Sequence, residues 1–195
     1  CQSSIPRPRS EKLHAGESGL AARLFAPIAA LSLDTLTLTG EGSLMNRPFE
    51  MVTNGLAALG VKTTGGNTLP ITIEGPLVGG EIEIDGSISS QFLTGLLLAL
   101  PYAEKDSKVL VHNLTSRPYI EMTLEVMRAF DLDFTHETLD SCDTFLIPAG
   151  QTSRSLPLST DGDWSAASTF LVLGGLCARP DLEIKGIRGI FTQAD

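Results

Sequence analysis

The chain has 195 residues, of which 42% are hydrophobic, and a formal net charge of −9, which suits a globular protein with one domain or one domain and part of another. The negative charge argues against a nucleic-acid partner, because phosphate backbones are bound by clustered Lys and Arg. Its three cysteines lack a metal-binding spacing and favour a reducing cytoplasm, and no apolar run reaches the roughly 18 residues of a membrane span.

The spacing of apolar residues predicts helices and strands that alternate along the chain. A first series is expected to hold a helix at 19–32, a strand at 35–40, a helix at 47–60 and strands at 61–64, 69–75 and 81–85. A second series has a helix at 89–103, a strand at 107–112, a helix at 117–131 and strands at 134–138, 144–150 and 154–159. Another helix is expected within 161–177.

The second series repeats the first at an offset of 70 positions, which carries Arg47 onto Arg117 and Gly16 onto Gly86. A third copy opens at Gly162, but its second helix would only be starting near residue 193. Repetition at this period indicates duplicated supersecondary units that bury their apolar faces against one another. The chain is therefore expected to be a piece of a longer protein.

Small polar residues lead into several of the predicted apolar helices, as in "GESG" (16–19), "GSISSQ" (86–91) and "GDWSAAS" (162–168). A helix N-terminus has unpaired N–H groups and a partial positive charge, so serines there either cap the helix or help to hold an anion. Capping alone explains any single serine. Ser89 and Ser90 followed by Gln91 exceed what a cap needs, and they form a candidate ligand site.

Arg47 and Arg117 each precede a proline at a predicted helix start, where a cation opposes the helix dipole. A bound carboxylate or phosphate would explain this placement, because guanidinium grips such groups bidentately. The alternative is a surface arginine without a partner. Arg23, one turn inside the first predicted helix, either points back to the N-terminus of that helix or forms a salt bridge elsewhere.

Two further residues have competing interpretations. Tyr119 either offers its phenol to a ligand or packs in the core. Asp163 is a helix N-cap or a catalytic acid, and the cap is the preferred interpretation. His14, His112 and His136 share no spacing, so neither a metal site nor a Ser-His-Asp triad is predicted.

Several stretches resemble the enolpyruvyl transferases, and among them most closely the EPSP synthase (3-phosphoshikimate 1-carboxyvinyltransferase) family. They are "GESGLAAR" (16–23), "GEGSLMNRP" (40–48), "DGSISSQFLTGLLLALP" (85–101), "SRPYIEMTLEVMRAF" (116–130) and "GDWSAAS" (162–168). They follow the family's order over almost the whole chain. The "DGSISSQ" stretch is the most specific, because the sister family that acts on UDP-N-acetylglucosamine is not expected to share it.

The resemblance implies transfer of the carboxyvinyl group of phosphoenolpyruvate to the 5-hydroxyl of shikimate 3-phosphate, with release of phosphate, in chorismate and aromatic amino acid biosynthesis. Neither a metal nor an organic cofactor is implied. The residues implied for shikimate 3-phosphate are Ser89, Ser90, Gln91, Ser116 and Tyr119. Those implied for phosphoenolpyruvate are Gly19, Arg47 and Gln91, with Gly19 allowing close approach to the backbone.

The fold implied is α/β (α+β), built from repeated βαβαββ units of an inside-out α/β barrel that is incomplete here. Residues 1–161 would form most of the first domain and 162–195 the start of the second. The family's opening Lys-Ser motif, catalytic Asp and Glu, Asp-His-Arg block and final Lys have no counterpart in the chain. We therefore expect no catalytic residue here and no activity from this chain alone, with the full enzyme a cytoplasmic monomer.

Two alternatives remain at this point. One is the sister transferase that uses UDP-N-acetylglucosamine, which the Ser89, Ser90 and Gln91 cluster disfavours. The other is a non-catalytic repeat domain that binds an anionic metabolite or a partner protein.

Overall fold

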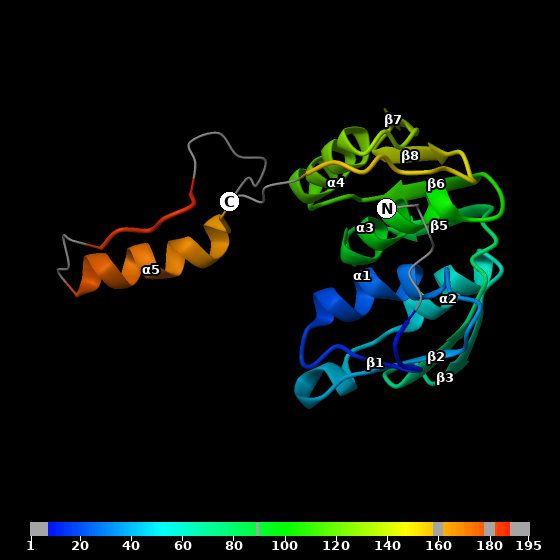
Figure 1. Ribbon diagram of the computed structural model, residues 1–195, viewed down its shortest axis with the longest axis horizontal. Helices are drawn as coiled ribbons and strands as arrows, with labels where there is room; N and C mark the ends of the chain where they lie inside the picture. Colours follow the sequence, from blue (N-terminus) through cyan, green and yellow to red (C-terminus); the bar gives the residue numbers. More distant parts are fainter. Residues whose placement is uncertain (1–7, 89, 158–161, 178–181, 188–195) are drawn as a thin grey trace. The chain divides into compact units, whose positions relative to one another are not determined.

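The computed structural model describes residues 8–88, 90–157, 162–177 and 182–187 (Figure 1). The chain divides into two compact units, Cys1–Arg154 and Ser155–Asp195. The sequence-based boundary at 161–162 falls seven residues after this division. The assignment of the two units to two domains of a larger enzyme stays a prediction.

The first unit is made of two successive repeats with the same order of elements. The first repeat holds β1 (Lys12–His14), α1 (Gly19–Ala29), β2 (Leu36–Thr39), the 3-10 helix η1 (Gly42–Asn46), α2 (Glu50–Ala58), β3 (Lys62–Gly65) and β4 (Ile71–Glu74). The second holds β5 (Glu81–Asp85), α3 (Ser90–Ala99), the 3-10 helix η2 (Leu100–Tyr102), β6 (Ser107–His112), α4 (Arg117–Ala129), β7 (Thr135–Leu139) and β8 (Cys142–Ile147). Apart from the added 3-10 turns, each repeat is a βαβαββ unit, which confirms the predicted duplication.

Each repeat forms its own four-stranded sheet, and the two sheets have matching topology. The orders are β1-β2-β4-β3 and β5-β6-β8-β7. In each sheet the first two strands are parallel and the remaining pairings are antiparallel. The parallel pairing fits a strand–helix–strand crossover, and the antiparallel pairing of the last two strands of each repeat fits a direct turn between them. The α/β class is thus confirmed, with two separate sheets rather than a closed barrel in the described part of the chain.

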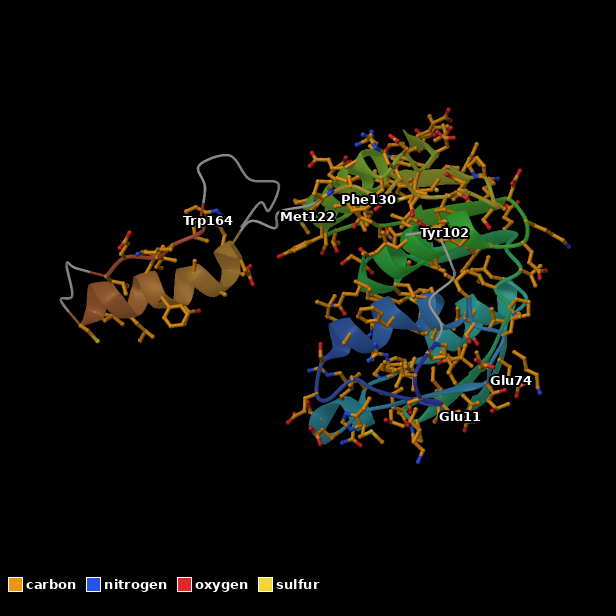
Figure 2. The ribbon with its side chains drawn as sticks, in the orientation of Figure 1. Glu11, Glu74, Tyr102, Met122, Phe130 and Trp164 are labelled. Atoms are coloured by element: carbon orange, nitrogen blue, oxygen red, sulfur yellow. The ribbon has the colours of Figure 1, made fainter. Side chains whose placement is uncertain are left out.

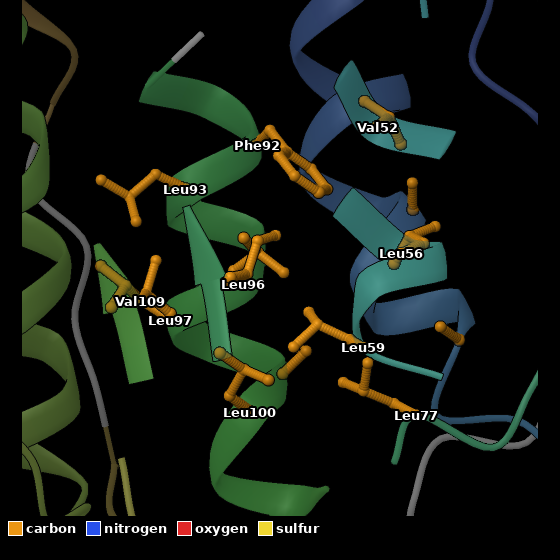
Figure 3. Close-up of a cluster of buried hydrophobic side chains, with 14 of the residues drawn as sticks. Val52, Leu56, Leu59, Leu77, Phe92, Leu93, Leu96, Leu97, Leu100 and Val109 are labelled. Carbon is orange, nitrogen blue, oxygen red and sulfur yellow. The ribbon is translucent and has the colours of Figure 1, made fainter. Parts of the chain in front are cut away.

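Helix α3 is the centre of the core of the first unit. Its Phe92, Leu93, Leu96 and Leu97 are fully buried, as its apolar sequence predicts. Figure 3 shows Phe92 and Leu96 turned toward α2, while Leu93 and Leu97 lie on the side of β6. Helices α1 and α3 lie side by side, with the two sheets on the outer sides of the helices (Figure 1). The sheets' outer surfaces carry polar pairs, such as Lys62 with Glu74 at 2.8 Å (Figure 2).

One predicted strand is wrong, and one strand was not predicted. Residues 154–157, the described part of the strand predicted at 154–159, form no strand, because the chain leaves the sheet after β8 ends at Ile147. Strand β1 was not predicted, since it has only three residues and one partly buried side chain. It exists because it pairs in parallel with β2, a contact that the local pattern does not reveal.

The second unit contains α5 (Trp164–Leu176), which confirms the helix predicted within 161–177. The Gly162 N–H donates to the carbonyl of Gly186 at 2.9 Å and closes a loop of this unit. Several of its apolar side chains are exposed, including Phe170 and Val172. Among the described residues, no helix has the length and apolar character needed to cross a membrane.

Candidate anion-binding site

A polar pocket of about 260 Å³ lies in the first unit, where segments of both repeats meet. It is lined by Arg23, Arg47, Gly86, Ser87, Ile88, Ser90, Gln91, Thr115 and Ser116. The first repeat supplies the two arginines, and the second supplies the segment leading into α3 and the segment leading into α4. Five residues singled out by the sequence (Arg23, Arg47, Ser90, Gln91 and Ser116) therefore share one pocket, while Ser89 lies outside the described residues.

The two arginines converge on the first residue of α1. A Cβ on Gly19 would lie 2.7 Å from Nη1 of Arg23 and 3.1 Å from Nη1 of Arg47. Burial, and then the neighbouring charge of Arg47, lower the pKa of Arg23 from its ordinary value. Arg23 also stacks over the ring of Phe49 at 5.2 Å. In the described part of the chain no carboxylate forms an ion pair with either arginine, so an anion bound here would relieve their mutual repulsion.

Local structure at the start of α1 explains how Gly19 and Arg23 are presented. Ser18 is the N-cap, and its Oγ accepts from the Ala21 N–H at 3.1 Å. Arg23 follows one turn later on the helix. The carboxylate of Glu17, which precedes the cap, packs over Gly42 in η1. This contact and the 2.8 Å hydrogen bond from Glu41 N–H to Gly16 carbonyl join the loop before α1 to η1.

A tight turn brings the second repeat into the pocket. The Asp85 carboxylate accepts from the Ser87 N–H at 2.9 Å, and the side-chain and backbone hydrogen bonds of Ser87 lower the pKa of Asp85. Between them, Gly86 packs closely, since a Cβ there would lie 2.9 Å from Cα of Leu114. The turn directs the chain into α3, so that Ser90 and Gln91 line the pocket in its first turn.

Ser116 and Tyr119 occupy the start of α4 but differ in position. Ser116 is the N-cap residue, yet its side chain makes no capping hydrogen bond, and it lines the pocket. Tyr119 is 42% exposed, so it is not the core residue that one interpretation suggested. It is absent from the pocket lining given by the described residues.

Arg117 is engaged away from the pocket. Its Nη1 and Nη2 donate to the two carboxylate oxygens of Asp143 at 2.9 and 2.7 Å. Arg117 is therefore paired with a carboxylate of the protein itself, not with a bound anion as the sequence suggested. Its equivalence to Arg47 in the repeat gave no sign of this partner. Asp143 comes from β8, 26 residues further along the chain.

Asp163 belongs to the second unit, where it caps α5. Its carboxylate accepts from the Ala166 N–H at 3.3 Å, which confirms the predicted N-cap. In the part of the chain that the structure describes, no group of three or more His, Cys, Asp or Glu is placed to hold a metal.

Sequence reasoning included Ser87 in the polar segment before α3 but missed Thr115 in the pocket, and it missed Asp143 altogether. Thr115 adjoins Ser116, which was identified, so the search around that motif could have included one more residue. Asp143 had its own signal, because it is in phase with the buried Phe145 and Ile147 of β8. A carboxylate at a core position of a strand calls for a buried partner.

Comparisons with known proteins agree on one family. A family model described as EPSP synthase (3-phosphoshikimate 1-carboxyvinyltransferase) matches residues 1–195. Curated proteins of that name include one from Clostridium novyi, 32% identical over 92% of this chain and 42% of its own length. Another from Pseudoalteromonas translucida is 37% identical over 95% of this chain and 44% of its own length. The chain thus spans less than half the length of these relatives.

A solved structure gives the same result. EPSP synthase from Acinetobacter baumannii superimposes with a TM-score of 0.67 and 28% sequence identity, covering 85% of this chain and 36% of that protein. The similarity therefore extends from motifs to the arrangement of the elements.

Proposed function

Because this chain belongs to the EPSP synthase family, we propose that the complete enzyme containing it transfers the carboxyvinyl group of phosphoenolpyruvate to the 5-hydroxyl of shikimate 3-phosphate and releases phosphate. The observation that carries the proposal is the convergence of Arg23 and Arg47 on Gly19, in a pocket shared with Gln91. Both proposed substrates are anions, and guanidinium groups are suited to their carboxylate and phosphate groups.

The pocket residues divide between the two substrates in this proposal. Arg47 and the backbone at Gly19 hold phosphoenolpyruvate, and Arg23 adds positive charge beside them. Ser89, Ser90 and Gln91 hold shikimate 3-phosphate, with Ser116 and Tyr119 assisting. Gln91 lies where it can serve both, since its amide both donates and accepts.

The proposal assigns binding, not proton transfer, to this part of the enzyme. The polar side chains of the described pocket are cations, hydroxyls and an amide, whereas general acid–base catalysis needs groups that titrate near the working pH. The catalytic acid and base are expected elsewhere in the enzyme, so this chain alone is expected to be inactive. The proposed enzyme is a cytoplasmic monomer without metal or organic cofactor, with 1–161 and 162–195 in different domains.

The test is isothermal titration of the complete enzyme with shikimate 3-phosphate, with UDP-N-acetylglucosamine and inorganic phosphate as comparison ligands. We expect saturable binding of the shikimate ester, and Arg47→Ala is expected to weaken the subsequent binding of phosphoenolpyruvate by about 10–100-fold, the value of a hydrogen-bonded charge. Arg154→Ala is the matched control, because Arg154 is an exposed arginine paired with Asp131. Preference for UDP-N-acetylglucosamine would favour the sister transferase, and binding of phosphate alone a non-catalytic anion binder.

A further inference from the structure

A fully buried carboxylate lies at a position of β8 where an apolar residue is expected. Asp143 is 0% exposed and stands between Val111 of β6 and Thr138 of β7. Its side chain is on the same face of the strand as Phe145 and Ile147, which are core residues. Burial of a charge in such a position is costly unless the charge is fully paired.

Three side chains converge on the Asp143 carboxylate. Besides the two hydrogen bonds from Arg117, its Oδ1 accepts from Thr138 Oγ1 at 2.7 Å and lies 2.9 Å from His136 Nε2. The His136 ring is itself held by stacking on Phe145, with ring centroids 4.3 Å apart. The carboxylate is therefore fixed from the sheet side, and it presents a rigid bidentate acceptor to Arg117.

The arginine that Asp143 holds is the first residue of α4. A cation there opposes the partial positive charge of the helix N-terminus, and the charges that attract Arg117 are those of Asp143 and, one turn along α4, Glu121. A buried ion pair replaced by apolar residues of similar size is often equally or more stable. Stability alone thus does not account for the pair, and its geometric effect is the more informative property.

The ion pair fixes the backbone next to Ser116, which precedes Arg117 and lines the pocket. Because the Ser116 hydroxyl makes no capping hydrogen bond, the helix does not fix its direction. One turn further along, α4 contacts α3 through the Thr123 hydroxyl, which lies 3.4 Å from that of Thr94 and also donates to the Tyr119 carbonyl of its own helix at 2.8 Å. The start of α4 is thus held to the sheet by Arg117, and its second turn is held to α3.

We propose that Asp143 is a positioning residue for the anion pocket: through Arg117 it fixes the first turn of α4 and thereby places the Ser116 hydroxyl for the ligand. The identity of the ligand, shikimate 3-phosphate, rests on the proposed function. The positioning role of Asp143 does not depend on that identity, so the positioning role and the proposed function can be tested separately.

The test compares Asp143→Asn and the paired replacement Arg117→Leu with Asp143→Leu, both in the complete enzyme. The paired variant leaves no unpaired charge, although His136 and Thr138 lose an acceptor, so its thermal midpoint is expected to fall by only a few degrees. Amide hydrogen exchange at residues 115–120 is nevertheless expected to rise about tenfold, with exchange in β6 and β8 unchanged. A control with Lys62→Leu and Glu74→Leu removes another ion pair and is expected to leave exchange at 115–120 as it was.

Binding supplies the second readout. The dissociation constant for shikimate 3-phosphate is expected to rise about tenfold in the paired variant, and Ser116→Ala added to it is expected to cause no further loss, because both changes remove the same contact. Additive losses, or unchanged exchange at 115–120, would overturn the proposal. If the paired variant does not fold, Asp143→Asn is carried through the same cycle. If the wild type does not bind shikimate 3-phosphate, the proposed function fails, and the exchange measurement alone decides the role of Asp143.

Discussion

Gly95 of α3 lies directly against the backbone of Leu24 in α1, where a Cβ would be 3.1 Å from the Leu24 Cα and closer still to its carbonyl group. This contact lets the two helices approach each other, and it joins the two repeats. Since the pocket is built from both repeats, its dimensions depend on how closely α1 and α3 pack.

Gly95→Ala is expected to lower the free energy of unfolding by about 1–3 kcal/mol, because the added methyl group meets backbone that cannot rotate away. Urea denaturation followed by circular dichroism measures this. Gly66→Ala is the control, since a Cβ on Gly66 meets nothing within 4 Å. An equal effect of the two substitutions would contradict the close helix contact.

Gly19→Ala is expected to act on ligand binding rather than on stability. The added methyl group would meet the ends of the Arg23 and Arg47 side chains, which are flexible and can move at little cost. Moving them disturbs the proposed phosphoenolpyruvate site, so its affinity is expected to fall about tenfold, a typical value for a charge-assisted hydrogen bond. Titration calorimetry should find shikimate 3-phosphate binding nearly unchanged, and a comparable loss for both ligands would be inconsistent with the division of the pocket.

Ser18 and Ser116 are both N-cap residues, of α1 and α4, but are expected to respond differently to replacement by alanine. Ser18→Ala removes a capping hydrogen bond and should destabilise the fold by about 1 kcal/mol. Ser116→Ala removes a hydroxyl without a capping role, so stability should change by less than about 0.5 kcal/mol. Thermal unfolding of the two variants checks this, and a larger loss for Ser116→Ala would show that its hydroxyl has a structural role.

The Asp143 carboxylate predicts a specific dependence of stability on pH. Burial by itself raises the pKa of Asp143, but hydrogen bonds from Arg117, Thr138 and His136 and the charge of Arg117 outweigh burial and lower it. A carboxyl whose pKa is lower in the folded state stabilises the protein above its unfolded pKa of about 3.9, and this contribution is lost as the pH falls toward the folded value.

Asp143→Asn is therefore expected to cost about 2–3 kcal/mol at pH 7, somewhat less than for a fully buried pair because the Arg117 side chain is 45% exposed and can turn to solvent. The difference from the wild type should narrow as the pH is lowered below about 4. Urea midpoints measured from pH 7 to pH 3 provide the check. A constant difference over this range would mean that the lost stability does not come from the charge of Asp143.

The repeat and most of its elements could be predicted from the sequence, because hydrophobic period and helix punctuation are local properties. Strand β5 was predicted with the bounds that the structure shows, Glu81–Asp85. Strand β1 was missed because three residues carry too little pattern, and its existence depends on pairing with β2. The strand expected after β8 failed for the converse reason, since an apolar pattern forms no strand without a partner.

The candidate site was predictable in composition but not in arrangement. Arg47 and Arg117 occupy equivalent positions of the repeat, so the local pattern treats them alike, and only the family resemblance assigned phosphoenolpyruvate to Arg47. The structure separates them: Arg47 lies beside Arg23 at the pocket, while Arg117 is paired with Asp143. The choice depends on a residue of β8 that only the folding of the second sheet brings near the start of α4.

The sequence by itself determined the duplicated βαβαββ units, the polar residues at the helix starts and the family to which the chain is similar. All of these depend on the order and spacing of residues that are close together in the sequence. Only the tertiary structure decided that Arg23, Arg47, Gln91 and Ser116 share one pocket. They come from segments up to 93 residues apart in the sequence, and their separation in space is set by the packing of α1 on α3 and by the register of each sheet.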